Sequence, residues 1–536
     1  MKEPIKEKMI SRNTSVRDAC LRIFRFVHAG WAFFVLVWLW GGWYYGEVLK
    51  VARAQSFWVA NPMQMEFVLN KSNGWLWYVG RMVLQLYYYP WLGGLTLAVL
   101  LGGGSVLINR VLHIPQYFKW IGYIPALAYL FAVSYSGLDV YFETETGTFF
   151  GWPCAVFVVF LFLALLQIVF FRQSLYGLFY SSGKAPVGGN FLQLAVCVIG
   201  FIVCVSFVEQ KRPYVRVISK MILHTMSQDW DGAIKTAHQH ADQSNRPMAA
   251  HYAIALMHKN QQCDRMYDIR LDFDSLYIHG WNGKPKVSNR LFESECNFHA
   301  GLVQTAYRNC MEMMVTNGPS IRGLELMTKC ALMRNEWRLA GKYLCILKDV
   351  PFESHFYRKY VKMLYTPKLI NEDPEIAHIR LTEPMHDAFE SSFVHPVFLG
   401  YNVRLREGRS ANAAWNSMAA CLYSKMMPDF VTRVVPFRNA SLPENVADGI
   451  LLASNGQPQL VQMFQHMDLR IQRLDGFLKG VSPYLSDRPG NARKLFDRYK
   501  GYYPYYYFFG NLHNTIRQDE SFQSAINGGE VRQTVN

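Results

Sequence analysis

The sequence predicts an all-α protein in which a bundle of about five transmembrane helices precedes a soluble α-helical repeat domain. Up to Val208 the chain consists of long apolar runs with almost no charge inside them, whereas from Glu209 onward it is polar and slightly basic. Apolar residues of the second part recur with the 3.6-residue period of helices. Aromatic residues make up 15% of the chain, and many flank the apolar runs as interfacial belts do in membrane proteins.

The first predicted span covers residues 24–45, long enough to cross a hydrocarbon core about 30 Å thick. Residues 1–23 are basic, which places this N-terminal segment in the cytoplasm by the positive-inside rule. A cleaved signal peptide is the alternative, because Ala52-Arg53-Ala54 has the A-x-A form of a cleavage site. The long basic segment and the Trp-rich apolar run favour an uncleaved anchor.

The second apolar stretch, residues 76–108, would measure roughly 50 Å as a single helix, which exceeds the bilayer core. Pro90 divides it, so we expect an interfacial helix at 76–89 and a span at 90–108. The remaining spans of the transmembrane domain, which covers residues 24–208, are expected at 120–141, 149–171 and 191–208.

Charges between the spans predict the topology. The loops before the third span and after the fourth are basic, whereas the charged residues between these spans are all acidic. Five spans with a cytoplasmic N-terminus place the C-terminal domain on the extracytoplasmic side. Lys211-Arg212 at the junction favours the opposite side, although long domains translocate largely regardless of local charge.

Residues 209–365 show a repeated pattern. Trp230 is followed by Ala233, and Trp337 by Ala340, in two stretches that look like copies of one unit. The two Trp residues are 107 positions apart, close to three units of about 34 residues. The pattern resembles tetratricopeptide-type repeats, which implies a stack of paired helices with a concave binding surface.

A further helical region is expected over residues 366–520, and a flexible tail over 521–536. The densest aromatic cluster of the chain lies at residues 498–510. We interpret it either as a capping element packed on the last helices or as an exposed interaction patch. The candidate patch residues are Tyr502, Tyr503, Tyr505, Tyr506 and Tyr507.

The layout as a whole resembles that of uncharacterised bacterial multispan inner-membrane proteins with a C-terminal tetratricopeptide-like domain. The resemblance rests on the order of the parts and on one aromatic motif, Gln85-Leu-Tyr-Tyr-Tyr-Pro-Trp-Leu-Gly93. It covers most of the chain. It implies the cytoplasmic membrane of a bacterium and a multi-pass chain, and it brings no known chemistry.

The spacing of candidate ligands predicts neither a metal site nor a cofactor. His238 and His240 point to opposite sides of a helix, and His251 and His258 lie about 10 Å apart along one. The ten cysteines include no Cys-x-x-Cys pair. Those of the soluble half are expected to be buried free thiols, with disulfides as the alternative.

One polar cluster is expected at the outer membrane interface. It consists of Arg81, Asp139, Glu143 and Glu145, with Glu66 nearby. An arginine among carboxylates could bind a lipid headgroup or carry out acid–base chemistry. The alternative is an exposed acidic loop beside an interfacial arginine.

The net charge of +15 is spread thinly, without a Lys/Arg-rich run, which argues against nucleic acid as a partner. The expected partners are membrane lipid and another protein, bound through the helical repeats. We therefore favour a non-catalytic, membrane-anchored protein that presents an extracytoplasmic interaction surface. The alternative is a membrane enzyme or transport component acting on a lipid-linked or glycan substrate at the outer interface, but the predicted spans hold few charges.

Overall fold

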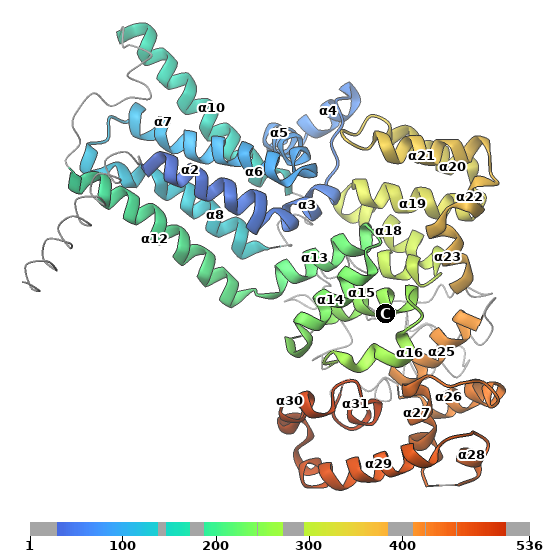
Figure 1. Ribbon diagram of the computed structural model, residues 1–536. Coiled ribbons are helices and arrows are strands. Elements are labelled where there is room, and N and C mark those ends of the chain that lie inside the picture. Colours follow the sequence, from blue (N-terminus) through green and yellow to red (C-terminus); the bar gives the residue numbers. More distant parts are fainter. Residues whose placement is uncertain are drawn as a thin grey trace, which may run out of the picture. The chain divides into compact units, whose positions relative to one another are not determined.

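The computed structural model describes residues 29–137, 146–171, 187–243, 245–271, 294–383, 411–423, 425–456 and 458–510. Within these ranges every regular element is a helix, so the all-α prediction is confirmed for this part of the chain. The chain divides into two compact units (Figure 1). The first holds residues 1–216 and 349–352, and the second holds residues 217–348 and 353–536.

The first unit contains mostly apolar helices. They are α2 (Ala29–Leu39), η1 (Trp40–Tyr44), α3 (Gly46–Ala54), α4 (Pro62–Leu69), α5 (Gly74–Gln85), η2 (Leu86–Tyr88), α6 (Pro90–Ala98), η3 (Val99–Gly103), α7 (Gly104–Val111), η4 (Gln116–Tyr123), α8 (Ile124–Ser136), α10 (Thr146–Phe171) and α12 (Val187–Lys211).

Three helical stretches of the described chain are long and apolar enough to cross a membrane: Pro90–Val111, Phe150–Val169 and Leu192–Lys211. They match the spans predicted at 90–108, 149–171 and 191–208. The predicted division of the second apolar stretch at Pro90 is also observed, since Pro90 is the first residue of α6. Proline is accepted in the first turn of a helix.

The other two predicted spans are not among these three. The described part of the span at 24–45 consists of α2, with 11 residues, followed by η1. The span at 120–141 is replaced by the end of η4 and by α8, which has 13 residues. Neither α2 nor α8 alone has the ~17–25 residues that a crossing helix needs. The described residues therefore hold three candidate spans, fewer than the five that the sequence predicted.

Glycines let the helices of the first unit approach closely. A Cβ atom on Gly94 of α6 would lie 2.5 Å from the backbone nitrogen of Gly42 in η1. Small residues serve the same purpose in helix pairs of membrane proteins. The apolar windows of α10 and α12 are only 17% buried, against 56% for Pro90–Val111, so α10 and α12 present most of their apolar side chains outward.

The second unit is a succession of short helices. They are the end of α13 (Tyr214–Met226), then α14 (Trp230–Gln239), η5 (Ala241–Gln243), α15 (Arg246–His258), α16 (Gln262–Arg265), η6 (Met266–Asp268), α18 (Val303–Asn317), α19 (Ile321–Met333), α20 (Trp337–Leu347), α21 (Ser354–Tyr365), α22 (Leu369–Glu372), α23 (Pro374–Thr382), α25 (Ala411–Tyr423), α26 (Met427–Val434), η7 (Val435–Phe437), α27 (Glu444–Ser454), α28 (Pro458–Gln462), α29 (Asp468–Val481), η8 (Ser482–Asp487), α30 (Arg488–Tyr499) and α31 (Tyr503–Phe509).

Helices that follow one another in the sequence pack together in the first part of this unit. The pairs are α14 with α15, α18 with α19, α19 with α20, and α20 with α21. Side chains cap several helix starts. Ser320 accepts a hydrogen bond from the backbone nitrogen of Gly323, and Asp373 accepts two from the first turn of α23.

The two Trp/Ala pairs of the repeat pattern occupy equivalent helix positions. Trp230 and Trp337 are the first residues of α14 and α20, and both are half-buried. Ala233 and Ala340 are completely buried, each in a different core cluster. The alanines therefore stand where neighbouring helices meet, and the indole rings pack at the edges of the clusters.

The Tyr-rich end of the chain fills a core. Tyr502, Tyr503, Tyr505 and Tyr506 are buried, and Tyr507 is half-buried. The hydroxyl of Tyr503 donates to the carbonyl of Leu422 at 3.0 Å, and that of Tyr506 to the carbonyl of Tyr423 at 2.6 Å. Because these two phenols find partners inside, the rings of Tyr503 and Tyr506 can be buried. The structure thus places four of the five candidate patch residues in the interior rather than on the surface.

A larger side chain at the close helix contact should loosen the array. Ala340→Leu is expected to destabilise the region of α19 to α21 by about 1–3 kcal/mol, because the buried site has no room for three more carbons. Hydrogen exchange of α20 amides in the full chain measures the change. Arg338→Leu, at an exposed position of the same helix, is the matched control. Equal protection in both variants would show that Ala340 is not a packing contact.

Candidate functional site

The polar cluster predicted at the membrane interface is described only at Arg81. Asp139, Glu143 and Glu145 lie outside the described residues. Arg81 lies on α5 and is 6% exposed, so it is buried rather than exposed at an interface. Its guanidinium carbon lies 4.9 Å from the centre of the Trp77 ring. Glu66 is on α4 and is exposed.

The second unit holds a buried cluster of five charged side chains, which we call the charged core. Arg322 donates to both carboxylate oxygens of Glu295, one of them at 3.0 Å, and to Glu325 at 2.9 Å. The Lys329 ammonium lies 2.7 Å from both oxygens of Glu375. All five residues are less than 9% exposed: Glu295, Arg322, Glu325, Lys329 and Glu375.

Three of these residues lie along α19. Arg322, Glu325 and Lys329 are three and four positions apart, so they project from one face of this buried helix. Glu295 comes from the helical segment at residues 294–299, and Glu375 from the first turn of α23. The sequence pattern does not reveal this cluster. Its only local signal is the mixture of charged and apolar residues in a helix whose first twelve positions are all buried.

Neighbouring charges decide how the carboxyls titrate. Burial alone would raise the pKa of Glu375, but Lys329 overcomes it and lowers that pKa to about 2. Arg322 likewise holds the pKa of Glu295 below its ordinary value against the effect of burial. For Glu325 burial dominates, and it raises the pKa to about 7.

A chain of histidines adjoins the charged core. The Nε2 atom of His299 lies 3.7 Å from Glu295 Oε2, and its Nδ1 atom shares a 3.1 Å hydrogen bond with His258. The His258 ring stacks between Trp230, at 3.9 Å, and His378, at 4.2 Å. Burial lowers the pKa of His299 to about 4 and that of His258 further, so both rings are neutral near pH 7.

These rings do not converge on a metal position. Stacked imidazoles direct their nitrogens along parallel planes, and in the described part of the chain no three His, Cys, Asp or Glu side chains could hold one ion. Of the nine cysteines described, seven are buried.

One hydrogen-bonded series superficially resembles a hydrolase triad. Asp229 Oδ2 lies 2.8 Å from His224 Nδ1, and His224 Nε2 lies 3.4 Å from the hydroxyl of Thr236. The hydroxyl belongs to a residue that is only 3% exposed, inside α14. Asp229 also accepts from the backbone nitrogen of Gly232, which lowers its pKa. The series caps α14 and presents no nucleophile to a substrate.

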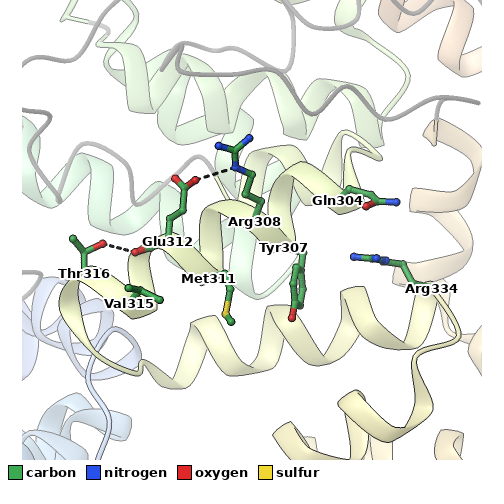
Figure 2. A pocket seen from close by; sticks show the side chains of 8 residues that line it. All are labelled: Gln304, Tyr307, Arg308, Met311, Glu312, Val315, Thr316 and Arg334. Carbon is green, nitrogen blue, oxygen red and sulfur yellow. Dashed lines mark hydrogen bonds and ion pairs between the residues drawn. The ribbon is translucent and has the colours of Figure 1, made fainter. Parts of the chain in front are cut away.

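An open groove follows α18 (Figure 2). Its volume is about 600 Å³, and it is lined by Gln304, Tyr307, Arg308, Met311, Glu312, Val315, Thr316 and Arg334. Tyr307, Met311 and Val315 point to one side of the helix, whereas Arg308 and Glu312 point to the other and form an ion pair (Figure 2).

The apolar stripe of this groove is exposed. Met311 is 42% exposed and Val315 is 81% exposed. The hydroxyl of Tyr307 lies 2.8 Å from that of Tyr343 in α20, which fixes the ring, and the Arg334 guanidinium stands 5.6 Å from the ring centre. The groove can therefore contact an apolar surface that carries acidic groups at its edge.

A family of unknown function, DUF6057, matches residues 137–510. The chain belongs to this family. The match runs from the end of α8 to the end of α31, so the DUF6057 region includes α10, α12, the charged core and the groove. No curated protein and no solved structure matches the chain.

Glu325 should make the stability of α19 depend on pH. Its folded pKa of about 7 exceeds the ~4.3 of an unfolded glutamate, so the folded state binds the extra proton between these values. Stability from this group is complete below about pH 4.3 and is lost as the pH rises through about 7, by at most ~1.4 kcal/mol per pH unit.

Glu325→Gln should remove this decline, because the amide does not titrate. Hydrogen exchange of α19 amides in the full chain, corrected for the intrinsic rate at each pH, measures it. Glu312→Gln, at an exposed position of α18, is the control. An unchanged decline in Glu325→Gln would mean that another group causes it.

Proposed function

We propose that this protein is a membrane-anchored helical-repeat protein whose second unit binds a partner protein in the groove along α18. The observation that carries the proposal is the apolar stripe inside that groove, formed by the half-buried Tyr307 and the exposed Met311 and Val315. The three residues are spaced by four, so they form one continuous line along the helix.

The surroundings of the stripe match the composition of a protein interface. Apolar side chains lie in the centre, and the ion pairs of Arg308 with Glu312 and of Arg334 with Glu336 lie at the rim. An amphipathic helix of the partner suits a straight apolar line better than an extended peptide does, since it brings its own side chains at every third or fourth position.

The membrane anchor in this proposal is the first unit. Its three long apolar helices support a multi-pass chain in a cytoplasmic membrane, which the resemblance to bacterial inner-membrane proteins would make that of a bacterium. The shorter α2 and α8 would complete the bundle beside them. We place the second unit on the extracytoplasmic side, on the alternation of basic and acidic loops.

The charged core does not favour the alternative of a membrane enzyme. Its carboxylates and cations are paired with one another and enclosed, and the histidines beside it are neutral and stacked. General acid–base catalysis needs an ionisable group that faces a substrate. A structural role in the array explains the same residues without a substrate.

Site-specific photo-cross-linking tests the groove in cells. A photoreactive residue in place of Val315 is expected to give one discrete cross-linked protein, and Met311→Asp in the same chain should reduce its yield at least tenfold. Leu469, which is 79% exposed on α29, is the control position. The same products from positions 315 and 469, or none from 315, would contradict a partner site on α18.

A further inference from the structure

Two cations contact one buried indole ring in the first unit. The Arg81 guanidinium carbon lies 4.9 Å from the ring centre of Trp77, and the Lys71 ammonium lies 5.1 Å from it. Trp77 is 7% exposed, whereas Lys71 is exposed and also lies 4.6 Å from Phe67. An aromatic face attracts each cation, but two like charges near one ring repel each other.

The polar atoms at this point lack partners. The Arg81 side chain forms no hydrogen bond or ion pair with any described residue, although a guanidinium carries five N–H donors. Its Nε atom is buried and unbonded, and so is the indole Nε1 of Trp77. Among the described residues the buried Arg81 charge has no counter-charge, which is costly, so both groups are suited to bind an anion.

The surrounding helices do not supply that anion. The stretch from Gly46 to Gln85 holds four basic residues, Lys50, Arg53, Lys71 and Arg81, against two acidic ones, Glu47 and Glu66. Neither glutamate forms an ion pair with Arg81 in the part of the chain that the structure describes. The long helix α10, which packs along α5, contains no acidic or basic residue.

The position of α5 indicates where the anion comes from. A Cβ atom on Gly151 would lie 2.3 Å from the carbonyl oxygen of Leu76, so α5 touches α10 close to the start of its apolar stretch at Phe150. In a membrane, that end of the helix lies at the level of the lipid headgroups. Trp75, 63% exposed on α5, is the kind of residue found there.

We propose that Arg81, Lys71 and Trp77 bind the phosphate group of an anionic membrane lipid. The planar guanidinium donates to two phosphate oxygens, the ammonium adds a second charge, and the indole N–H donates a further hydrogen bond. The assignment of the phosphate to a lipid rests on the membrane anchoring proposed above. It does not depend on the groove of α18.

The test uses the purified full chain in a neutral detergent. Phosphatidylglycerol is titrated in, with phosphatidylcholine and inorganic phosphate as separate arms, and the thermal unfolding midpoint is followed. Phosphatidylglycerol is expected to raise the midpoint. Arg81→Gln should weaken its apparent affinity at least tenfold, and Lys71→Gln less. Lys50→Gln, which removes an exposed cation from nearby α3, should behave as the unchanged protein does.

Native mass spectrometry of the same samples counts bound lipid, so a change in the variant's own stability does not obscure the result. Equal retention of phosphatidylglycerol by Arg81→Gln and the unchanged chain would overturn the proposal, as would equal binding of phosphatidylcholine. If inorganic phosphate alone gives an Arg81-dependent shift, the phosphate site stands and the lipid as its source is refuted. Failure of the cross-linking at Val315 would leave all these results intact.

Discussion

The exposed apolar surface of α10 and α12 is the main physical constraint on the structure of the first unit. Their apolar windows are only 17% buried, and Val158, Phe162 and Ile202 are each more than half exposed. Uninterrupted helices suit a hydrocarbon surrounding, because their backbone hydrogen bonds are satisfied internally. We infer from this that lipid completes the fold of this unit, and the glycine contacts between α6 and η1 then set how tightly the bundle closes.

The second unit is built differently, because many short helices have to be held in one arrangement. The charged core joins three separate segments, because Arg322 pairs with Glu295 and Lys329 pairs with Glu375. Replacing paired buried charges by apolar residues is often neutral or stabilising. Our hypothesis is that these pairs select one arrangement of α19 and α23 rather than add much stability, and that they hold α18 in the position that exposes its groove.

Features that depend on local sequence were predicted well. The apolar runs of α10 and α12 and the break at Pro90 follow from composition and from the chemistry of proline, and the helical period follows from apolar spacing. The predicted length of the span at 120–141 was wrong. Part of this apolar run forms the 3-10 turns of η4, and α8 ends at Ser136.

Features that depend on distant contacts were not predicted. Glu295 and Arg322 are 27 positions apart, and Lys329 and Glu375 are 46 apart, so each looks like an ordinary surface charge in the sequence. The sequence left open whether the tyrosines of residues 502–507 are packed or exposed for the same reason, since the partners Leu422 and Tyr423 precede them by more than 80 residues. Arg81 is likewise buried by the residues packed around it, and the periodicity of its own helix in the sequence does not predict those contacts.

An apolar, membrane-confined photoreactive probe tests the central claim that the two units occupy different solvents. Labelled in native membranes and mapped by mass spectrometry, the chain should carry the probe on outward residues of α10 and α12, such as Phe162 and Ile202, and not on α18 to α21. Labelling of α18 to α21 to the same extent, or none on α10 and α12, would contradict the division of the chain between lipid and water.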